Sequence, residues 1–394
     1  MKILRMSSAL AIAASFALAS CGGGGGGGIG GTGSAQGTLR LAITDAPSCG
    51  YDAVNITIEK VRVHRNIDAA DGDAGWSEIV LSPARRIDLL TLSNGVLQDL
   101  GQTLLPAGKY TQLRLVLAAN GTATPPPNSV VPTGETETAL TTPSAQQSGL
   151  KLNTNIDVAS DQVADFVLDF DACKSVVKRG NSGQYNLKPV ISVIPRLSDA
   201  GMRVVGYVDA SIAGSAALVS LQSNGVPVKA TSPDANGQFV LYPVPAGTYD
   251  LVVTSTGHLT AVMTGVPVVL SAYTYVNSSA AAIAPPAAAS APRAVTGTVT
   301  PPTATVRALQ TLTGGPTIEA AWAPVDAVTG AFPLSLPIQA PVRTLYAANP
   351  AALVFAPDTG AAGKYTIEAA AAGALKTLPI NVTSPVPPLS FSFP

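Results

Sequence analysis

Short runs of alternating apolar and polar residues, separated by glycine and proline, constrain this fold more than any other feature. Apolar residues occupy every second position over residues 39–43, 113–117 and 166–170. A side-chain period of two is that of a β-strand with one buried face. Glycine and proline together number 37 + 32 = 69 of 394 residues, which supplies turns but stays below the roughly 25–30% typical of low-complexity chains. The sequence therefore predicts an all-β protein of two or three domains.

Charge and histidine content narrow the function classes. The chain has 23 basic and 24 acidic residues, a net charge of −1, whereas nucleic-acid binding needs a clustered basic face. The two histidines, His64 and His258, lie in separate segments, and the sequence has no Gly-x-Ser-x-Gly, His-Glu-x-x-His or Cys-x-x-Cys motif. We expect no nucleic-acid partner, no cofactor and no Ser-His type of catalysis.

The N-terminus has the pattern of an export signal. Two basic residues precede residues 9–19, a run that is apolar apart from one serine and is too short to span a bilayer. Residues 18–21, Leu-Ala-Ser-Cys, resemble the bacterial lipobox. This resemblance implies a signal peptide over residues 1–20, cleavage before Cys21, and acylation of that cysteine with chains such as palmitate. An ordinary secretory signal with an unrelated cysteine is the alternative.

A glycine-rich segment over residues 21–37 follows the predicted cleavage site. Such a composition behaves as a flexible tether. Gly22, not aspartate, follows the cysteine, and by resemblance to Gram-negative sorting rules this favours the outer membrane. No later apolar run reaches about 18 residues, so lipid would be the only membrane attachment. We expect a monomeric, lipid-anchored protein of the cell envelope.

Two further cysteines, Cys49 and Cys173, remain after the lipidated one. An exported protein occupies a compartment in which disulfides persist. We therefore predict a disulfide between Cys49 and Cys173. Two buried thiols are the alternative.

The first predicted module covers residues 38–198. Its apolar phase changes at residues 59–60, which predicts a β-bulge, and the Pro/Thr/Ser-rich residues 121–147 predict a long surface loop. An ordered set of short motifs occupies residues 37–47, 51–54, 61–64, 75–76, 87–90, 106–110, 149–151, 168–171 and 187–190. This set resembles the bacterial domain of unknown function DUF4382. The resemblance implies a β domain, found in lipoproteins with appended β-sandwich modules, that carries no established activity.

Two more β-rich modules follow. In the second, residues 199–283, the segment 232–239 with its Asn-Gly pair predicts a hairpin. This module resembles the carboxypeptidase regulatory-like, or transthyretin-like, β-sandwich, which is not itself a peptidase. An Ala/Pro linker at residues 284–293 leads to a C-terminal module over residues 294–394. Residues 326–332 repeat the Asp-to-Phe pattern of the second module, which favours a diverged duplicate. The expected architecture is thus a tandem of Ig- or transthyretin-like sandwiches.

One tetrapeptide pattern occurs in each module. Ala-Gly-x-Tyr ends at Tyr110, Tyr249 and Tyr365, each before a predicted strand. A corner tyrosine that fastens a strand edge gives this pattern in sandwich folds. A ligand site at each tyrosine is the alternative reading.

Three carboxylates, Asp165, Asp169 and Asp171, share one face of the strand predicted around residues 166–170. Two adjacent carboxylates can act as general acid and base, or hold an ion. The polar outer face of a half-buried strand gives the same pattern. Basic partners for ion pairs are available at Lys151, Lys174 and Lys188.

A second acidic group, Asp68, Asp71 and Asp73, lies in one loop. Calcium takes several oxygen ligands from a short loop, but the spacing differs from an EF-hand. A solvated hairpin tip is the simpler interpretation. The two tryptophans, Trp76 and Trp322, are either core residues or aromatic platforms for a sugar.

These observations favour a non-catalytic, membrane-anchored envelope lipoprotein with a scaffold or surface-binding role. Its expected partners are the membrane, through the N-terminal lipid, and a glycan or an envelope protein. A carbohydrate-binding protein is one alternative, by fold analogy. A glycan hydrolase that uses Asp169 and Asp171 is another, and it would need a cleft with two carboxylates about 5–10 Å apart.

Overall fold

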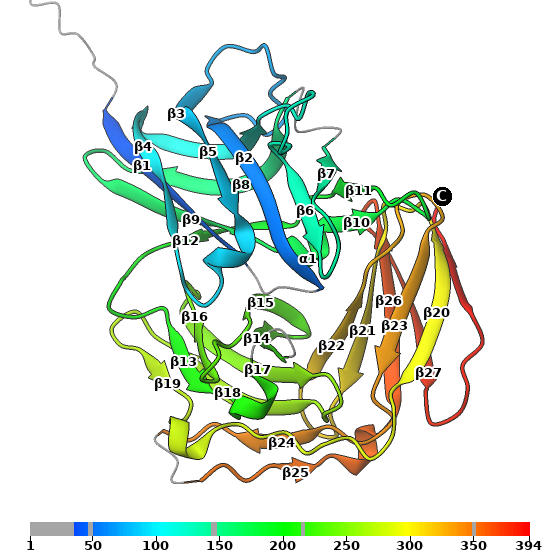
Figure 1. Ribbon diagram of the computed structural model, residues 1–394. Helices are drawn as coiled ribbons and strands as arrows, with labels where there is room; N and C mark the ends of the chain where they lie inside the picture. Colours follow the sequence, from blue (N-terminus) through cyan, green and yellow to red (C-terminus); the bar gives the residue numbers. More distant parts are fainter. Residues whose placement is uncertain (1–34, 46–49, 143–147, 214–216, 349–351) are drawn as a thin grey trace, which may run out of the picture. The chain divides into compact units, whose positions relative to one another are not determined.

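The computed structural model describes most of the chain (Figure 1). The described residues are 35–45, 50–142, 148–213, 217–348 and 352–394. Residues Ala35–Pro394 form one compact unit built almost entirely from β-strands, which confirms the predicted all-β class. Among the described residues, no helix combines the length and apolar composition needed to cross a membrane. The predicted signal peptide, Cys21 and the tether up to residue 34 lie outside the described residues.

The first module is a sandwich of two sheets (Figure 1). Its strands are β1 (Gln36–Asp45), β2 (Tyr51–His64), β3 (Ser77–Asp88), β4 (Gln98–Pro106), β5 (Gly108–Leu117), β6 (Ser129–Pro132), β7 (Thr138–Thr141), β8 (Leu150–Val158), β9 (Val163–Phe170), β10 (Val176–Lys178), β11 (Tyr185–Leu187) and β12 (Ile191–Pro195). One sheet has the order β12-β9-β1-β4, and the other has the order β10-β11-β7-β6-β2-β5-β8, with β3 beside β2. Leu41 of β1, Leu168 of β9 and Ile56 of β2 have no exposed surface and pack in the core between the sheets.

Two expectations about this module have different outcomes. The predicted bulge is confirmed, because the pairing of β2 with both β3 and β5 shifts register between Ile58 and Lys60. The predicted loop over residues 121–147 is wrong for the part that the structure describes, since it contributes β6 and β7 to the larger sheet. Val130 of β6 is fully buried there. A proline- and threonine-rich composition does not reveal so short a strand when tertiary packing stabilises it.

The second and third modules have the same strand topology. The second contains β13 (Val204–Tyr207), β14 (Ala217–Ser223), β15 (Val226–Thr231), β16 (Gln238–Leu241), β17 (Gly247–Ser255), β18 (Ala261–Val268) and β19 (Thr274–Tyr275). The third contains β20 (Arg293–Thr300), β21 (Thr305–Thr311), β22 (Thr317–Ala323), β23 (Ala331–Leu336), β26 (Lys364–Ala371), β27 (Ala374–Asn381) and β28 (Leu389–Ser392). The sheets β16-β13-β19 and β15-β14-β17-β18 correspond to β23-β20-β28 and β22-β21-β26-β27. This agreement supports the predicted duplication.

One segment crosses between these modules. β24 (Val342–Leu345) and β25 (Ala356–Pro357) come from the third module's sequence, between β23 and β26. They extend the second module's sheet, where β24 pairs in parallel with β18. The Ala/Pro segment before β20 also contacts the second module, because Ala287 forms a β-bridge with His258. The modules are therefore interlocked through strand pairing.

The turn at residues 232–237 differs from its prediction. Gly237 does adopt a positive φ of 80°, and its N–H donates to the carbonyl of Asp234 at 2.9 Å. However, the flanking strands β15 and β16 belong to different sheets, so the predicted hairpin is wrong. The chemistry of a turn fixes its local conformation but not the pairing of the strands on either side.

The three repeated tyrosines fasten strands to backbone carbonyls. The hydroxyl of Tyr110 donates to Pro106 O and that of Tyr249 to Pro245 O, each at 2.9 Å. Tyr365 instead donates to Pro337 O at 2.8 Å. Tyr110 and Tyr249 thus make the corner contact, and Tyr365 bonds to a more distant carbonyl. All three hydroxyls are engaged by backbone, which supports the structural interpretation over a ligand site.

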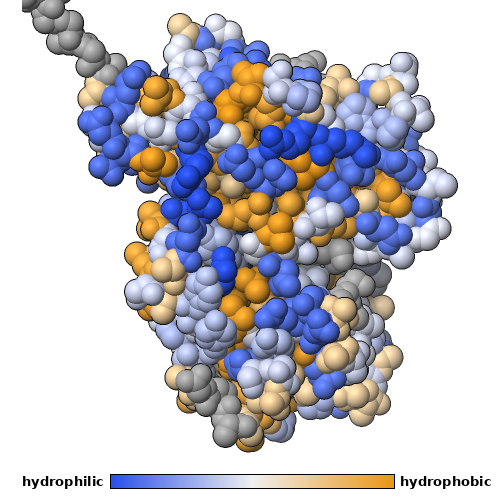
Figure 2. Space-filling model, turned by 60° about the vertical axis from the view of Figure 1, so that its left-hand side comes forward, coloured by the Kyte–Doolittle hydropathy of each residue, from blue (hydrophilic) through white to orange (hydrophobic). Residues whose placement is uncertain are grey.

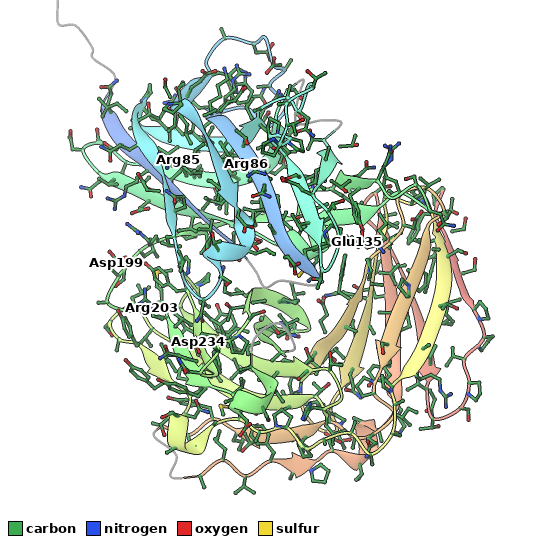
Figure 3. The ribbon with its side chains drawn as sticks, in the orientation of Figure 1. Arg85, Arg86, Glu135, Asp199, Arg203 and Asp234 are labelled. Carbon is green, nitrogen blue, oxygen red and sulfur yellow. The ribbon has the colours of Figure 1, made fainter. Side chains whose placement is uncertain are left out.

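The surface mixes charged and apolar side chains (Figure 2). Among the exposed apolar residues, Leu104 of β4 and Val163 of β9 are 64% and 57% exposed. Figure 3 places Arg85 and Arg86 on β3 and Arg203 and Asp234 in the second module. The labelled charges are thus distributed over more than one module.

Candidate functional site

The carboxylates of β9 each contact a cation. Oδ2 of Asp165 accepts from Nε of Arg40 at 2.8 Å and from Nε of Arg196 at 3.0 Å. Asp169 forms an ion pair with Lys229 of β15, in the second module. The side chains of Asp169 and Lys229 are only 10% and 1% exposed. A pair so well buried is costly to break, because removing one partner leaves an unpaired charge.

Asp171 begins a chain of charges that reaches the third module. It caps α1 (Ala172–Ser175), where its carboxylate accepts from the N–H of Lys174 at 2.9 Å. Nζ of Lys174 lies 2.9 Å from Oε1 of Glu319 on β22. Arg307 of β21 contacts Glu319 at 3.4 Å and Glu368 at 2.6 Å. We call Asp171, Lys174, Glu319, Arg307 and Glu368 the junction network.

The predicted face of three aspartates therefore exists, but it serves contacts between elements. Asp169 faces the second module and Asp171 leads to the third. Burial raises the pKa of Asp171, against the opposing charge of Lys174. Of the lysines expected as partners, Lys174 has this role. Lys188 instead donates to the carbonyl of Ala304 at 3.3 Å, and burial lowers its pKa.

Asp45 is a buried acid that was not predicted as a site residue. It ends β1 and is 1% exposed. Oδ1 accepts from the N–H of Ala172 at 3.0 Å, while Oδ2 has no hydrogen-bond partner among the described residues. Burial raises the pKa of Asp45 well above its ordinary value, and the charges of Asp171 and Asp169 raise it further. Its place in the motif segment 37–47 was the only signal for this position in the sequence.

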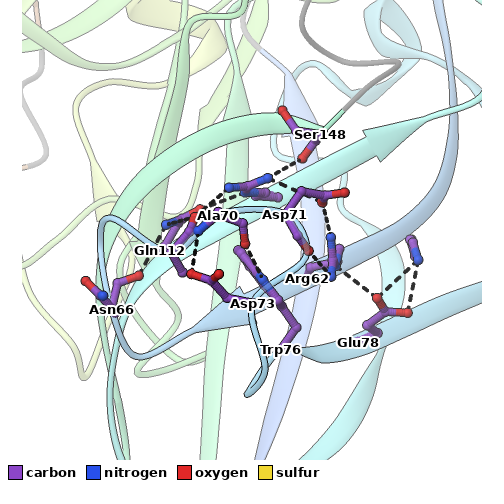
Figure 4. Close-up of polar contacts among 12 residues, drawn as sticks. Arg62, Asn66, Ala70, Asp71, Asp73, Trp76, Glu78, Gln112 and Ser148 are labelled. Carbon is purple, nitrogen blue, oxygen red and sulfur yellow. Dashed lines mark hydrogen bonds and ion pairs between the residues drawn. The ribbon is translucent and has the colours of Figure 1, made fainter.

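The acidic loop near residue 70 is a closed polar network (Figure 4). Asp71 pairs with Arg62, and it lies 3.4 Å from Arg114. Oδ2 of Asp73 accepts from the N–H of Ala70 at 2.8 Å. In the part of the chain that the structure describes, no group of three His, Cys, Asp or Glu side chains could hold a metal ion. Two of the three aspartates considered for calcium are thus engaged by protein groups.

The two tryptophans have different surroundings. The guanidinium carbons of Arg62 and Arg114 lie 4.5 Å and 4.7 Å from the centre of the Trp76 ring. Its indole N–H donates to Ala70 O at 2.9 Å (Figure 4). Trp76 therefore holds the loop in place. Trp322 on β22 is half-buried, and no described residue accepts from its indole N–H.

A cavity of about 650 Å³ is lined by residues of the first and third modules. Tyr51 and Tyr185 meet edge to face there, with ring centres 6.3 Å apart. Glu135, labelled in Figure 3, and Asp326 supply carboxylates. Desolvation opposes ionisation of Asp326, but hydrogen bonds from the Thr329 and Val328 N–H groups lower its pKa overall. The carboxylate of Asp326 is thus used to stabilise the turn in which it lies.

Both histidines bond to backbone carbonyls. Nε2 of His64 lies 3.0 Å from Ala74 O, and Nδ1 of His258 lies 3.0 Å from Thr256 O. No described serine hydroxyl bonds to either ring. Cys173 lies in α1, whereas Cys49 lies outside the described residues, so the disulfide between them stays a prediction.

Residues 36–189 match the model of the family described as "Domain of unknown function (DUF4382)". This confirms the recognition of that domain in the first module. The match does not extend to the lipobox or to the two later modules. A search of curated proteins finds no match.

Solved structures offer weak similarities. Two interface mutants of a type II cohesin–X–dockerin complex from Acetivibrio cellulolyticus are 28% and 26% identical over 21% and 22% of this chain, with TM-scores of 0.18 and 0.19. The matches span 56% and 59% of those chains. BcpA, the major pilin subunit of Bacillus cereus, is 11% identical over 91% of this chain and 99% of its own, with a TM-score of 0.14. TM-scores this low carry no argument.

Proposed function

We propose that this chain, whose first module is a DUF4382 domain, is a non-catalytic lipoprotein that acts as a scaffold or binding protein in the cell envelope. The observation that carries the non-catalytic part is that the acids in and just after β9 are all engaged by groups of the protein. Asp165, Asp169 and Asp171 each face a cation or cap a helix. Such contacts stabilise the arrangement of modules, whereas a hydrolase needs carboxylates free to face substrate.

The anchoring part rests on the sequence around Cys21. A basic n-region, an apolar run and Leu-Ala-Ser-Cys together match a lipoprotein signal. A lipid anchor with a glycine-rich tether would hold the modules off a membrane surface. The outer membrane of a Gram-negative cell is the proposed location, and an oxidising compartment there would allow the predicted disulfide between Cys49 and Cys173 to form.

Acylation is testable on the protein expressed in a Gram-negative host. We expect the wild-type protein to fractionate with membranes and to carry a mass consistent with cleavage before Cys21 and added acyl chains. Cys21→Ser should abolish the acyl mass and release the protein from membranes. Ser20→Ala, which keeps a small residue before the cysteine, is the matched control and should remain anchored. Unprocessed wild-type protein in the cytosol would refute the proposal.

A further inference from the structure

Trp322 adjoins three cavities, of about 540, 230 and 380 Å³. It lies on β22, which is an edge strand of its sheet and contacts β14, β15 and β17 of the second module. The cavity of 380 Å³ is charged, because it contains Lys174, Glu319 and Arg307 of the junction network. The cavity of 540 Å³ differs in the charge of its lining residues.

The larger cavity is neutral and rich in hydrogen-bonding groups. Among its described lining residues none is Asp, Glu, Lys or Arg. Its polar lining residues include Thr254, Ser255, Thr256, His258, Ser290 and Gln339. Leu218, Pro337 and Ile338 supply apolar surface. A large aromatic ring beside apolar and neutral polar groups is the composition of a small-molecule site.

Three of the polar groups at this cavity have no hydrogen-bond partner among the residues that the structure describes. Oγ of Ser255 is buried, and no described residue bonds to it. Oε1 of Gln339 accepts from Ala289 N–H at 2.6 Å, which leaves its amide N–H groups unbonded among the described residues. The indole N–H of Trp322 is likewise unbonded there. Because the buried Ser255 hydroxyl without a partner costs free energy, a ligand that supplies hydroxyl groups would be favoured there, and the half-buried Trp322 and Gln339 N–H groups are free to donate to it.

We propose that the cavity beside Trp322 binds a neutral oligosaccharide. The apolar face of a pyranose ring can stack on the indole, and its hydroxyls can bond to Ser255, Gln339 and the indole N–H. A neutral lining gives no counter-charge to a phosphate or a charged peptide. Trp76 cannot serve in the same way, since two guanidinium groups and Ala70 O already occupy its ring and N–H. This inference rests on the binding role proposed above and names its ligand class.

The chain offers a direct optical test, because it has only two tryptophans. Trp76→Phe leaves Trp322 as the single indole reporter in the full mature chain. The probes are cellohexaose, chitohexaose and maltohexaose, with a decaproline peptide as the competing ligand type. We expect at least one hexasaccharide to change Trp322 fluorescence saturably, and calorimetry on the wild type to give a matching Kd.

Variants then locate the site. Trp322→Ala should raise Kd about tenfold or more, since stacking on the indole is lost. Trp322→Phe should restore part of the affinity, because it keeps an aromatic face. Trp76→Phe should leave Kd unchanged, and circular dichroism with thermal melting checks that each variant is folded.

Three results would overturn the assignment. They are no heat or fluorescence change with any hexasaccharide at millimolar concentration, unchanged affinity in Trp322→Ala, or binding of decaproline in place of the sugars. None of them would alter the acylation result at Cys21, so this inference and the proposed anchoring fail independently.

Discussion

Asp45 and Lys229 are charged residue types with almost no exposed surface, 1% and 2% respectively. Taking a charge out of water costs several kcal/mol unless a partner compensates. Lys229 has Asp169 as its partner, whereas Asp45 accepts from the N–H of Ala172 on one oxygen and has no partner on the other in the part of the chain that the structure describes. At Asp45, therefore, burial in the folded state opposes ionisation of the carboxyl group.

Asp45→Asn should flatten the pH dependence of stability. The folded-state pKa of Asp45 is raised above its ordinary value of 3.8, so the native state retains a proton that the unfolded state loses. Below pH 3.8 Asp45 is protonated in both states and its stabilising contribution to the free energy of unfolding is at its maximum. This contribution is lost as pH rises through the folded pKa, by at most about 1.4 kcal/mol per pH unit. The asparagine cannot ionise, and its stability relative to wild type should therefore increase from pH 4 to 7.

Urea unfolding at each pH measures this difference. Asp68→Asn, at an exposed position of the acidic loop, is the control and should follow the wild-type profile. Parallel profiles for Asp45→Asn and wild type would show that Asp45 does not carry the effect.

The sequence identified the acids in and just after β9, with Lys174 as one partner, but not the partners that come from the later modules. Lys229 is 60 residues from Asp169, and Glu319 is 145 residues from Lys174. Alternation along a strand shows which residues share a face, but it carries no information on what packs against that face. For the same reason Trp322 was recognised as a candidate platform, while the neutral residues around it, from several distant segments, were not.

Among the elements, the turns of the duplicated modules have closely matched geometry. Gly237 and Gly330 have φ values of 80° and 67°. A Cβ at these two positions would lie 2.1 Å from Val208 O and Val299 O, respectively. Glycine is therefore required for two reasons: the backbone adopts a positive φ, and a carbonyl oxygen lies too close to the Cα to leave room for a Cβ. The sequence predicted the first requirement from Asn-Gly, but it could not show the second.

Gly237→Ala should destabilise the protein by roughly 3 kcal/mol, since it adds a backbone clash to the φ strain. Gly257→Ala is the matched control, because Gly257 has a φ of 75° but no atom within 4 Å of a built Cβ. The control should cost only about 1 kcal/mol. Equal losses of stability in chemical denaturation would mean that the close approach is unimportant.

At the level of the whole molecule, the described modules interlock instead of following one another independently. The junction network joins the first and third modules, and β24 carries third-module sequence into the second module's sheet. The sequence correctly indicated three β-rich regions. It could not assign residues 342–345 to a sheet, because a four-residue strand has the same local pattern whichever neighbour it pairs with.

Val342→Asp should destabilise the second and third modules together. Val342 is 3% exposed and packs in the second module's core, opposite Ala261 of β18. An aspartate there would be buried without a partner, at a cost of about 3 kcal/mol or more. Hydrogen exchange should accelerate in both β18 and β26.

Leu345→Asp, on the same strand but 76% exposed, is the control and should change stability by less than about 0.5 kcal/mol. Faster exchange confined to β24 in the Val342 variant would show that the modules do not unfold together.

The position of β24 also has a consequence for biosynthesis. Synthesis runs from the N-terminus, and 73 residues, 269–341, separate the end of β18 from the start of β24. Throughout that interval the nascent chain presents β18 with one side open to incorrect partners. A holding chaperone would be most valuable at this stage, and premature termination anywhere between the two strands would leave a product prone to aggregation.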